Sequence, residues 1–153
     1  MKFEVISAKK NQIIQELIYC ALDSNMRSKH GACLVRGNKI LCMQKNIYGK
    51  DFKSCSWHAE VMIGKKINKK KIKNDLKFSY DLWVIRYSKH KNSCIESKPC
   101  YNCIKYIKRQ MPYVNNIIYS TKNGKFIKEN ISNIKNSHIS LGYRASSYLI
   151  RSR

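Results

Sequence analysis

At 153 residues the chain is long enough for one domain with one hydrophobic core, and no run of it approaches the roughly 18 apolar residues of a membrane-spanning helix. Seven scattered cysteines, and first residues without the apolar segment of a secretory signal, favour an intracellular protein of cytoplasm or nucleus over a secreted disulfide scaffold. The formal charge of +22 at pH 7 suggests an anionic partner such as nucleic acid, although the abundance of Lys, Asn and Ile is also what an A/T-rich genome would produce.

Apolar residues at helical spacing predict an amphipathic packing helix over residues 10–23. A β-hairpin is expected next. Residues 31–36 have the composition of a buried strand, Gly37-Asn38 is a two-residue turn signal, and residues 39–43 return as the second strand.

A second helix is predicted over roughly residues 57–67, with Ser56 as its cap. His58 and Glu60 lie near its start. Two residues this close in a helix interior point about 200° apart, so the two side chains converge only if the segment spans the beginning of the helix. The lysine-rich stretch 65–73 that follows is interpreted first as a solvated helix end, and alternatively as a patch that binds phosphates.

Residues 82–87 are apolar enough to form a central strand. The following residues 88–98 have no predicted structure. They contain His90 and Cys94, which are either loop residues or, together with Cys55, additional metal ligands.

Cys100 and Cys103 form a C-x-x-C pair at the start of a third predicted helix, about residues 100–110. Pro99 marks this start, because proline is tolerated at the N-terminus of a helix and not in its interior. Both thiols then lie on one face of the first turn, where the helix dipole favours the thiolate. With His58 as third ligand they would hold a zinc ion whose fourth position is open to water, the catalytic arrangement, with Glu60 as the neighbouring proton carrier.

The remaining chain predicts two more strands and an extension. Pro112 ends the third helix, and residues 116–120 form the fourth strand. Asn123-Gly124 is a turn signal that would lead into an antiparallel fifth strand at 126–127. Residues 131–153 have no clear period and end in basic residues, so the prediction is one domain over residues 1–153 with a basic C-terminal extension that closes a pocket or binds a partner.

His58-Ala59-Glu60, followed by Pro99-Cys100-Tyr101-Asn102-Cys103, resembles the H-x-E and P-C-x-x-C signature of the zinc-dependent cytidine/deoxycytidylate deaminase superfamily, and the resemblance includes residues 31–41. It implies an α/β fold of three α-β-α layers, with a central mixed five-stranded sheet flanked by helices. In that superfamily an antiparallel pair of last strands belongs with deaminases of free nucleosides. The nucleotide, tRNA-adenosine and polynucleotide deaminases usually run these strands parallel.

The resemblance also implies a Zn²⁺-dependent hydrolase that converts cytosine to uracil in a nucleoside or nucleotide and releases ammonia. It assigns the metal to His58, Cys100 and Cys103 and proton transfer to Glu60. Four residues are expected to contact the substrate. Asn46 would contact the sugar, Trp57 and Tyr101 would stack on the base because each adjoins a metal ligand, and Ala59 is the fourth contact. The structural alternatives are a turn residue for Asn46 and core packing for the two aromatics.

Two alternative functions remain open. One is a polynucleotide-editing deaminase acting on tRNA adenosine or single-strand cytosine, which the charge supports and a final hairpin disfavours. The other is a non-catalytic deaminase-fold protein that binds nucleic acid around a structural zinc ion, against which the carboxylate of Glu60 argues. Many members of the superfamily assemble, so a homo-oligomer is compatible with either.

Overall fold

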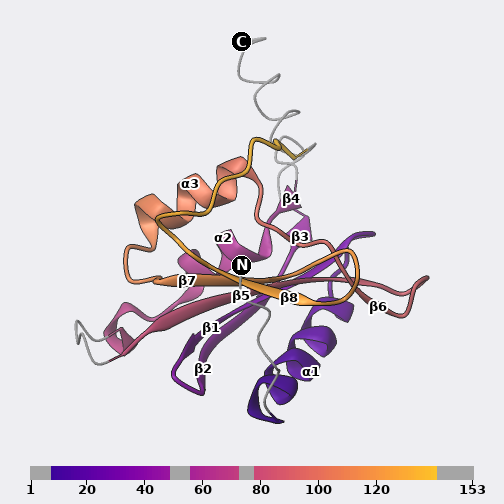
Figure 1. Ribbon diagram of the computed structural model, residues 1–153, viewed down its shortest axis with the longest axis horizontal. Coiled ribbons are helices and arrows are strands. Elements are labelled where there is room, and N and C mark those ends of the chain that lie inside the picture. The colour runs from indigo at the N-terminus through magenta and orange to yellow at the C-terminus, as the bar shows by residue number, and fades with distance from the viewer. Residues whose placement is uncertain (1–7, 49–55, 73–77, 141–153) are drawn as a thin grey trace.

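The computed structural model describes residues 8–48, 56–72 and 78–140, and in this part the chain forms three layers (Figure 1). A mixed β-sheet lies in the middle. Helix α1 (Ala8–Leu22) covers one face, and helices α2 (Ala59–Lys66) and α3 (Tyr101–Gln110) cover the other. The strands of the sheet are β1 (Lys29–Arg36), β2 (Lys39–Lys45), β5 (Tyr80–Ser88), β6 (Ser93–Ile95), β7 (Asn116–Ser120) and β8 (Phe126–Asn130). The predicted three-layer α/β fold is confirmed, and its mixed sheet contains the five predicted strands and one more, the short β6.

The strand order is β2-β1-β5-β7-β8, with the short strand β6 paired to the end of β5. Every neighbouring pair is antiparallel except β5 and β7, which run parallel. The chain crosses between these two strands through α3, as a parallel pair requires a crossover connection. The sheet therefore places the start of α3 at the end of the sheet where β5 finishes.

Alternating side chains on the two central strands build both cores. On β1 and β5, Ala32, Leu34, Leu82 and Val84 pack in the cluster with α2 and α3, whereas Cys33, Val35, Trp83 and Ile85 pack in the cluster with α1. Both faces of these strands are apolar because helices cover both. This explains why residues 82–87 have the composition of a central strand.

The last two strands form the predicted hairpin. β7 and β8 pair antiparallel from Asn116↔Asn130 to Ser120↔Phe126. The turn between them contains Gly124 at φ +72°, a backbone conformation that residues with a side chain rarely adopt. Gly37 has the same role, at φ +62°, in the turn between β1 and β2.

Several boundaries differ from the predicted ones. Strands β1, β2, β5 and β8 are each longer than predicted, because pairing with a neighbouring strand continues past the apolar run. The stretch 88–98, left without structure, contains β6, and a two-stranded sheet of β3 (Ile47–Tyr48) and β4 (Ser56–Trp57) precedes α2. Ser56 is thus a strand residue and not the cap of α2, which is His58. A short 3-10 helix, η1 (Lys69–Lys71), lies in the lysine-rich stretch.

After β8 the chain turns back along α3, and Figure 1 shows this segment passing over the helix toward its first turn. Ile134 is fully buried in the core beneath α3. The described part of the predicted extension, residues 131–140, is therefore packed on the domain. No helix in the described residues is both long and apolar enough to span a membrane.

Candidate metal centre

The two helices on one face of the sheet begin at residues that the sequence marks as metal ligands. His58 is the N-cap of α2 and Cys100 is the N-cap of α3, and both have extended backbone conformations. Neither side chain caps its own helix. The imidazole and the thiol are therefore available for another partner, and Cys103 projects from the first turn of α3 toward the same place.

The three side chains converge. The distance from Nδ1 of His58 is 3.1 Å to Sγ of Cys103 and 3.8 Å to Sγ of Cys100. All three donor atoms lie within 4.8 Å of one another, and among the described residues no other set of three His, Cys, Asp or Glu side chains does so. One imidazole and two thiols are the donor types that Zn²⁺ prefers, and three ligands leave one tetrahedral position open. The residues present fit a zinc ion.

The protonation of Cys100 suits a cation, whereas the hydrogen bond that Cys103 donates to Cys100, together with burial, raises the pKa of Cys103. The pKa of Cys100 is lowered to about 4, first by a hydrogen bond from Cys103 and then by the hydrogen bond and charge of His58. Cys100 is thus a thiolate at neutral pH, and the thiolate is the form that binds metal.

Glu60 lies in the first turn of α2, where its residue is only 3% exposed. Burial raises the pKa of its carboxyl group, and the nearby His58 partly opposes this effect. A carboxyl group whose pKa is shifted toward neutrality both accepts and donates a proton readily, as a proton carrier must. His58 precedes the helix and Glu60 lies inside it, which is the placement that convergence of the two side chains requires, and each group shifts the pKa of the other.

The segment after β8 contacts the centre through residues that the sequence does not single out. Oγ of Ser140 is 3.3 Å from Nε2 of His58, the ring nitrogen that faces away from the sulfur atoms. The carbonyl of His138 accepts a hydrogen bond from the backbone N–H of Tyr101, and Asn136 donates one to the carbonyl of Pro99. These contacts join residues about 40 or 80 positions apart, and no local pattern in residues 131–140 signals them.

Asn46 is buried at the end of β2, and its amide is held by neighbouring residues. Its Oδ1 accepts a hydrogen bond from the backbone N–H of His30 and lies 2.7 Å from Oγ of Ser24, while its Nδ2 donates to the carbonyl of Ser28. The His30 ring lies close to the centre. Its pKa is lowered to about 3 by burial and then by the positive charges of Arg86 and His58. Asn46 therefore has a structural role in this loop, and its contact with a sugar stays a prediction.

The other predicted substrate contacts lie in different surroundings. Ala59 is fully buried under α2. Trp57 is half-buried, and the ammonium group of Lys65 lies 4.1 Å from its ring centroid. Tyr101 is 47% exposed and lines a groove beside α3. Neither aromatic ring belongs to the hydrophobic core, so the core-packing alternative does not describe them.

Two of the three candidate additional ligands lie outside the cluster of donor atoms. Cys94 is buried in the cluster on the α1 side of the sheet, and His90 is exposed in the turn between β5 and β6. Cys55 lies outside the described residues.

No protein-family model and no curated protein sequence matches the chain. Among solved structures, it is similar to cytidine deaminase from Burkholderia pseudomallei, with a TM-score of 0.60 and 12% identity over 84% of this chain and 98% of that one. It is also similar to the dCMP deaminase of cyanophage S-TIM5 in complex with dCMP and dUMP, with a TM-score of 0.51 and 19% identity over 78% of this chain and 85% of that one. At these identities the similarity establishes the fold, which is that of cytidine deaminase.

Proposed function

We propose that this chain is a zinc-dependent deaminase that hydrolyses the exocyclic amine of cytosine in a nucleoside or nucleotide, leaving uracil and ammonia. One observation carries the proposal: the donor atoms of His58, Cys100 and Cys103 meet within 4.8 Å, and buried Glu60 follows His58 by two residues. A purely structural metal site has no use for a buried carboxylate at that position. The cytidine-deaminase fold supports the same function.

The chain's own groups prepare the metal site. His58 would bind zinc through Nδ1, because this nitrogen faces both sulfur atoms, while Nε2 carries the proton and donates it to Ser140. Cys100 would bind as the thiolate that its low pKa provides. A zinc ion with three such ligands supplies an activated water molecule at neutral pH.

Glu60 then performs the proton transfers. Its carboxylate takes a proton from the attacking water and gives it to the ring nitrogen of the base, which makes the adjacent ring carbon electrophilic. In the second half of the reaction Glu60 takes the remaining proton of the newly added hydroxyl group and delivers it to the departing amine, so the carbonyl of uracil forms as ammonia leaves. One group serves in both directions because burial places its pKa above the ordinary range, closer to the working pH.

The antiparallel pairing of β7 and β8 favours a free nucleoside as the substrate, since the resemblance associates that arrangement with nucleoside deaminases. We propose Asn46 as the contact to the sugar. Hydrogen bonds with Ser24 and Ser28 fix its side chain next to His30. His30 in turn lies close to His58, whose charge lowers the pKa of His30. Trp57, Ala59 and Tyr101 remain proposed contacts near the base.

The test is ammonia release from a panel of free cytosine nucleosides, cytosine nucleotides and single-stranded oligonucleotides, with zinc measured in the same protein samples. We expect about one zinc ion per chain and turnover of cytidine or deoxycytidine. A protein that holds zinc and releases no ammonia from any substrate would contradict the proposal. Turnover of oligonucleotides alone would instead identify a polynucleotide-editing enzyme.

A further inference from the structure

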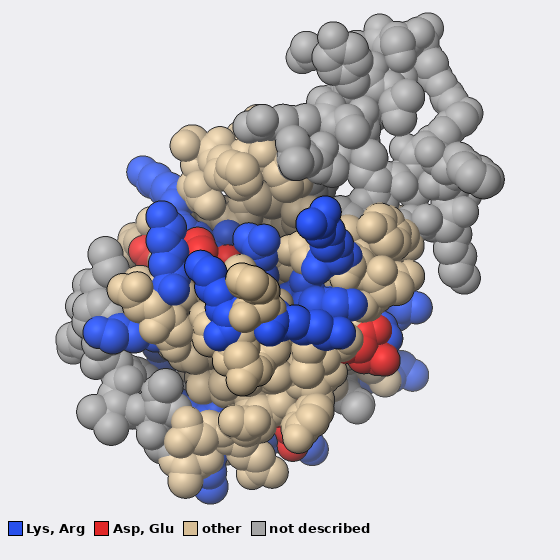
Figure 2. Space-filling view, turned by 90° about the vertical axis from the view of Figure 1, so that its right-hand side faces the viewer, with Lys and Arg blue, Asp and Glu red and all other residues tan. Residues whose placement is uncertain are grey.

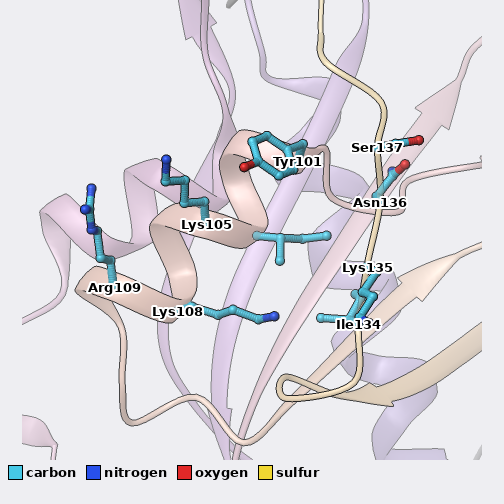
Figure 3. A pocket seen from close by; sticks show the side chains of 9 residues that line it. Tyr101, Lys105, Lys108, Arg109, Ile134, Lys135, Asn136 and Ser137 are labelled. Atoms are coloured by element: carbon cyan, nitrogen blue, oxygen red, sulfur yellow. The ribbon is translucent and has the colours of Figure 1, made fainter.

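A groove of about 770 Å³ runs between α3 and the segment after β8, outside the metal centre (Figure 3). Ile104 of α3 and Ile134 of the segment, both buried, form its apolar floor. Lys108 extends from α3 toward Ile134 and Lys135, and Tyr101 stands at the end of the groove beside Asn136 and Ser137. This α3 groove begins one residue after the ligand Cys100.

The charge of the α3 groove has one sign. Four cationic side chains line it: Lys105, Lys108, Arg109 and Lys135. Neither wall contributes an acidic residue, because none occurs in α3 or in residues 131–140. All four cationic residues are exposed. The walls therefore hold no carboxylate to neutralise these cations, and the complementary partner is an anion from outside the chain.

The apolar part of the α3 groove indicates which class of anion would fit it. A small phosphate needs only cations, whereas this groove also presents a tyrosine ring that is 47% exposed, above a floor formed by two buried isoleucine side chains. Unpaired bases stack on such rings, while the bases of a duplex are already stacked on each other. From Tyr101 to Arg109, α3 rises about 12 Å, the length of roughly three stacked nucleotides.

We infer that the α3 groove binds single-stranded nucleic acid, with phosphates on the lysines and arginine and a base on Tyr101. A second copy of this chain is the disfavoured occupant, because each copy has a net charge of +22. The inference concerns binding alone and holds whether or not the bound strand is also a substrate.

Fluorescence anisotropy with U12 RNA and dT12 DNA tests the inference on the full chain. Both probes lack cytosine and adenine, so binding does not depend on the proposed deaminase reaction. The test variant carries Lys105→Gln, Lys108→Gln, Arg109→Gln and Lys135→Gln. We expect it to bind at least tenfold more weakly at 100 mM salt. The magnitude of the slope of log K against log salt should also fall by about 3, because each phosphate contact contributes roughly 0.7 to that slope and four are lost. A 12-base-pair duplex should bind the wild type more weakly than either single strand.

Figure 2 shows Lys and Arg side chains over another face as well, so the loss of four charges needs a matched control. The control carries Lys9→Gln, Lys39→Gln, Lys89→Gln and Lys122→Gln, at four exposed positions outside the α3 groove. It should change the slope by less than about 1. If both variants lose the same affinity, or if the wild type does not bind the probes, the inference is wrong.

Two further measurements keep the result interpretable. Should the fourfold test variant fail to fold by circular dichroism, Lys108→Glu replaces it, with exposed Lys91→Glu as its control. Light scattering after gel filtration identifies the alternative occupant. If the groove substitutions change the mass of the particle and leave probe binding intact, the groove is an interface between copies, and the inference is overturned.

Discussion

His58 and Glu60 illustrate what residue spacing alone can predict. Two residues apart, they converge only at a helix start, and α2 begins between them at Ala59. The C-x-x-C pair was predictable for the same reason, since Pro99 marks the start of α3 and three-residue spacing keeps both thiols on one side. Ser140 was not predictable, because its contact with His58 spans 82 positions and depends on the path of the chain after β8.

Glu60→Gln is the sharpest residue-level test of the proposed reaction. Glutamine preserves the shape of the side chain but cannot carry a proton, so kcat should fall by about two to four orders of magnitude. Zinc should remain at the wild-type level, because Glu60 is not one of the three converging ligands. Ammonia release and elemental analysis check the two expectations. Glu16→Gln, at an exposed position of α1, is the control and should keep full turnover; an active Glu60→Gln protein would remove Glu60 from the mechanism.

Ser140→Ala tests whether the segment after β8 orients the metal ligand. Without the hydroxyl group, Nε2 of His58 loses its contact with Ser140, and the ring is less well held for binding through Nδ1. We expect zinc affinity to fall roughly tenfold, measured by competition with a chromogenic chelator. Ser137→Ala, an exposed serine of the same segment, should bind zinc like the wild type. Equal affinities for both variants would show that Ser140 is not a partner of the ligand.

His30 predicts a pH dependence of stability. Its pKa is about 3 in the fold, so between that value and about 6.5 the unfolded chain binds a proton that the folded chain does not. The free energy of unfolding is therefore unaffected by His30 above pH 6.5 and falls below it, by about 2 kcal/mol at pH 5. Urea unfolding of chelator-treated protein should show this loss in the wild type and a correspondingly flatter profile in His30→Gln. Exposed His90→Gln should keep the wild-type profile, and identical profiles for all three would contradict the prediction.

At the scale of elements, the long apolar segments were predicted and the short ones were not. Strands β1, β5 and β7 lie in the interior of the sheet, so burial on both faces leaves a clear apolar run. Strands β3, β4 and β6 have two or three residues each, and pairing with a distant partner creates them. Only the tertiary structure determines such strands, because so few residues carry no periodicity.

The packing of α1 on β1 provides an element-scale test. A Cβ atom at Gly31 would lie 3.0 Å from the backbone oxygen of Leu17 and 3.3 Å from Cβ of Ala21. Since backbone cannot move aside without shifting the helix, Gly31→Ala should lower the free energy of unfolding by about 1–3 kcal/mol in urea. At Gly64 the close atoms belong to the ring of Tyr106, which can rotate, and alanine favours a helix. Gly64→Ala should therefore cost less, and the reverse order would contradict this description of the interface.

For the whole molecule, the three-layer α/β fold was predictable through the resemblance of two short motifs. The orientation of the last strand depended on a single Asn-Gly turn signal, which the hairpin of β7 and β8 confirms. The net charge was the least informative feature. It does not distinguish between genome composition and a partner, whereas the α3 groove places four cations around an apolar lining.

Zinc should contribute to the stability of the whole domain, because its proposed ligands join the start of α2 to the start of α3. The hydrophobic cluster at these two helix starts is small, with Val61, Cys100 and Cys103 as its buried members. A ligand present at 1,000 times its Kd stabilises a fold by about 4 kcal/mol, and each kcal/mol shifts the Tm of a domain of this size by about 2–4 °C. Chelation should thus lower the Tm by roughly 10 °C in thermal melts, and added zinc should restore it. His58→Ala should melt at the same temperature with and without chelator, whereas His90→Ala, which alters an exposed turn, should respond like the wild type. If chelation lowers the Tm of His58→Ala as much as that of the wild type, the stabilising metal is bound elsewhere in the chain.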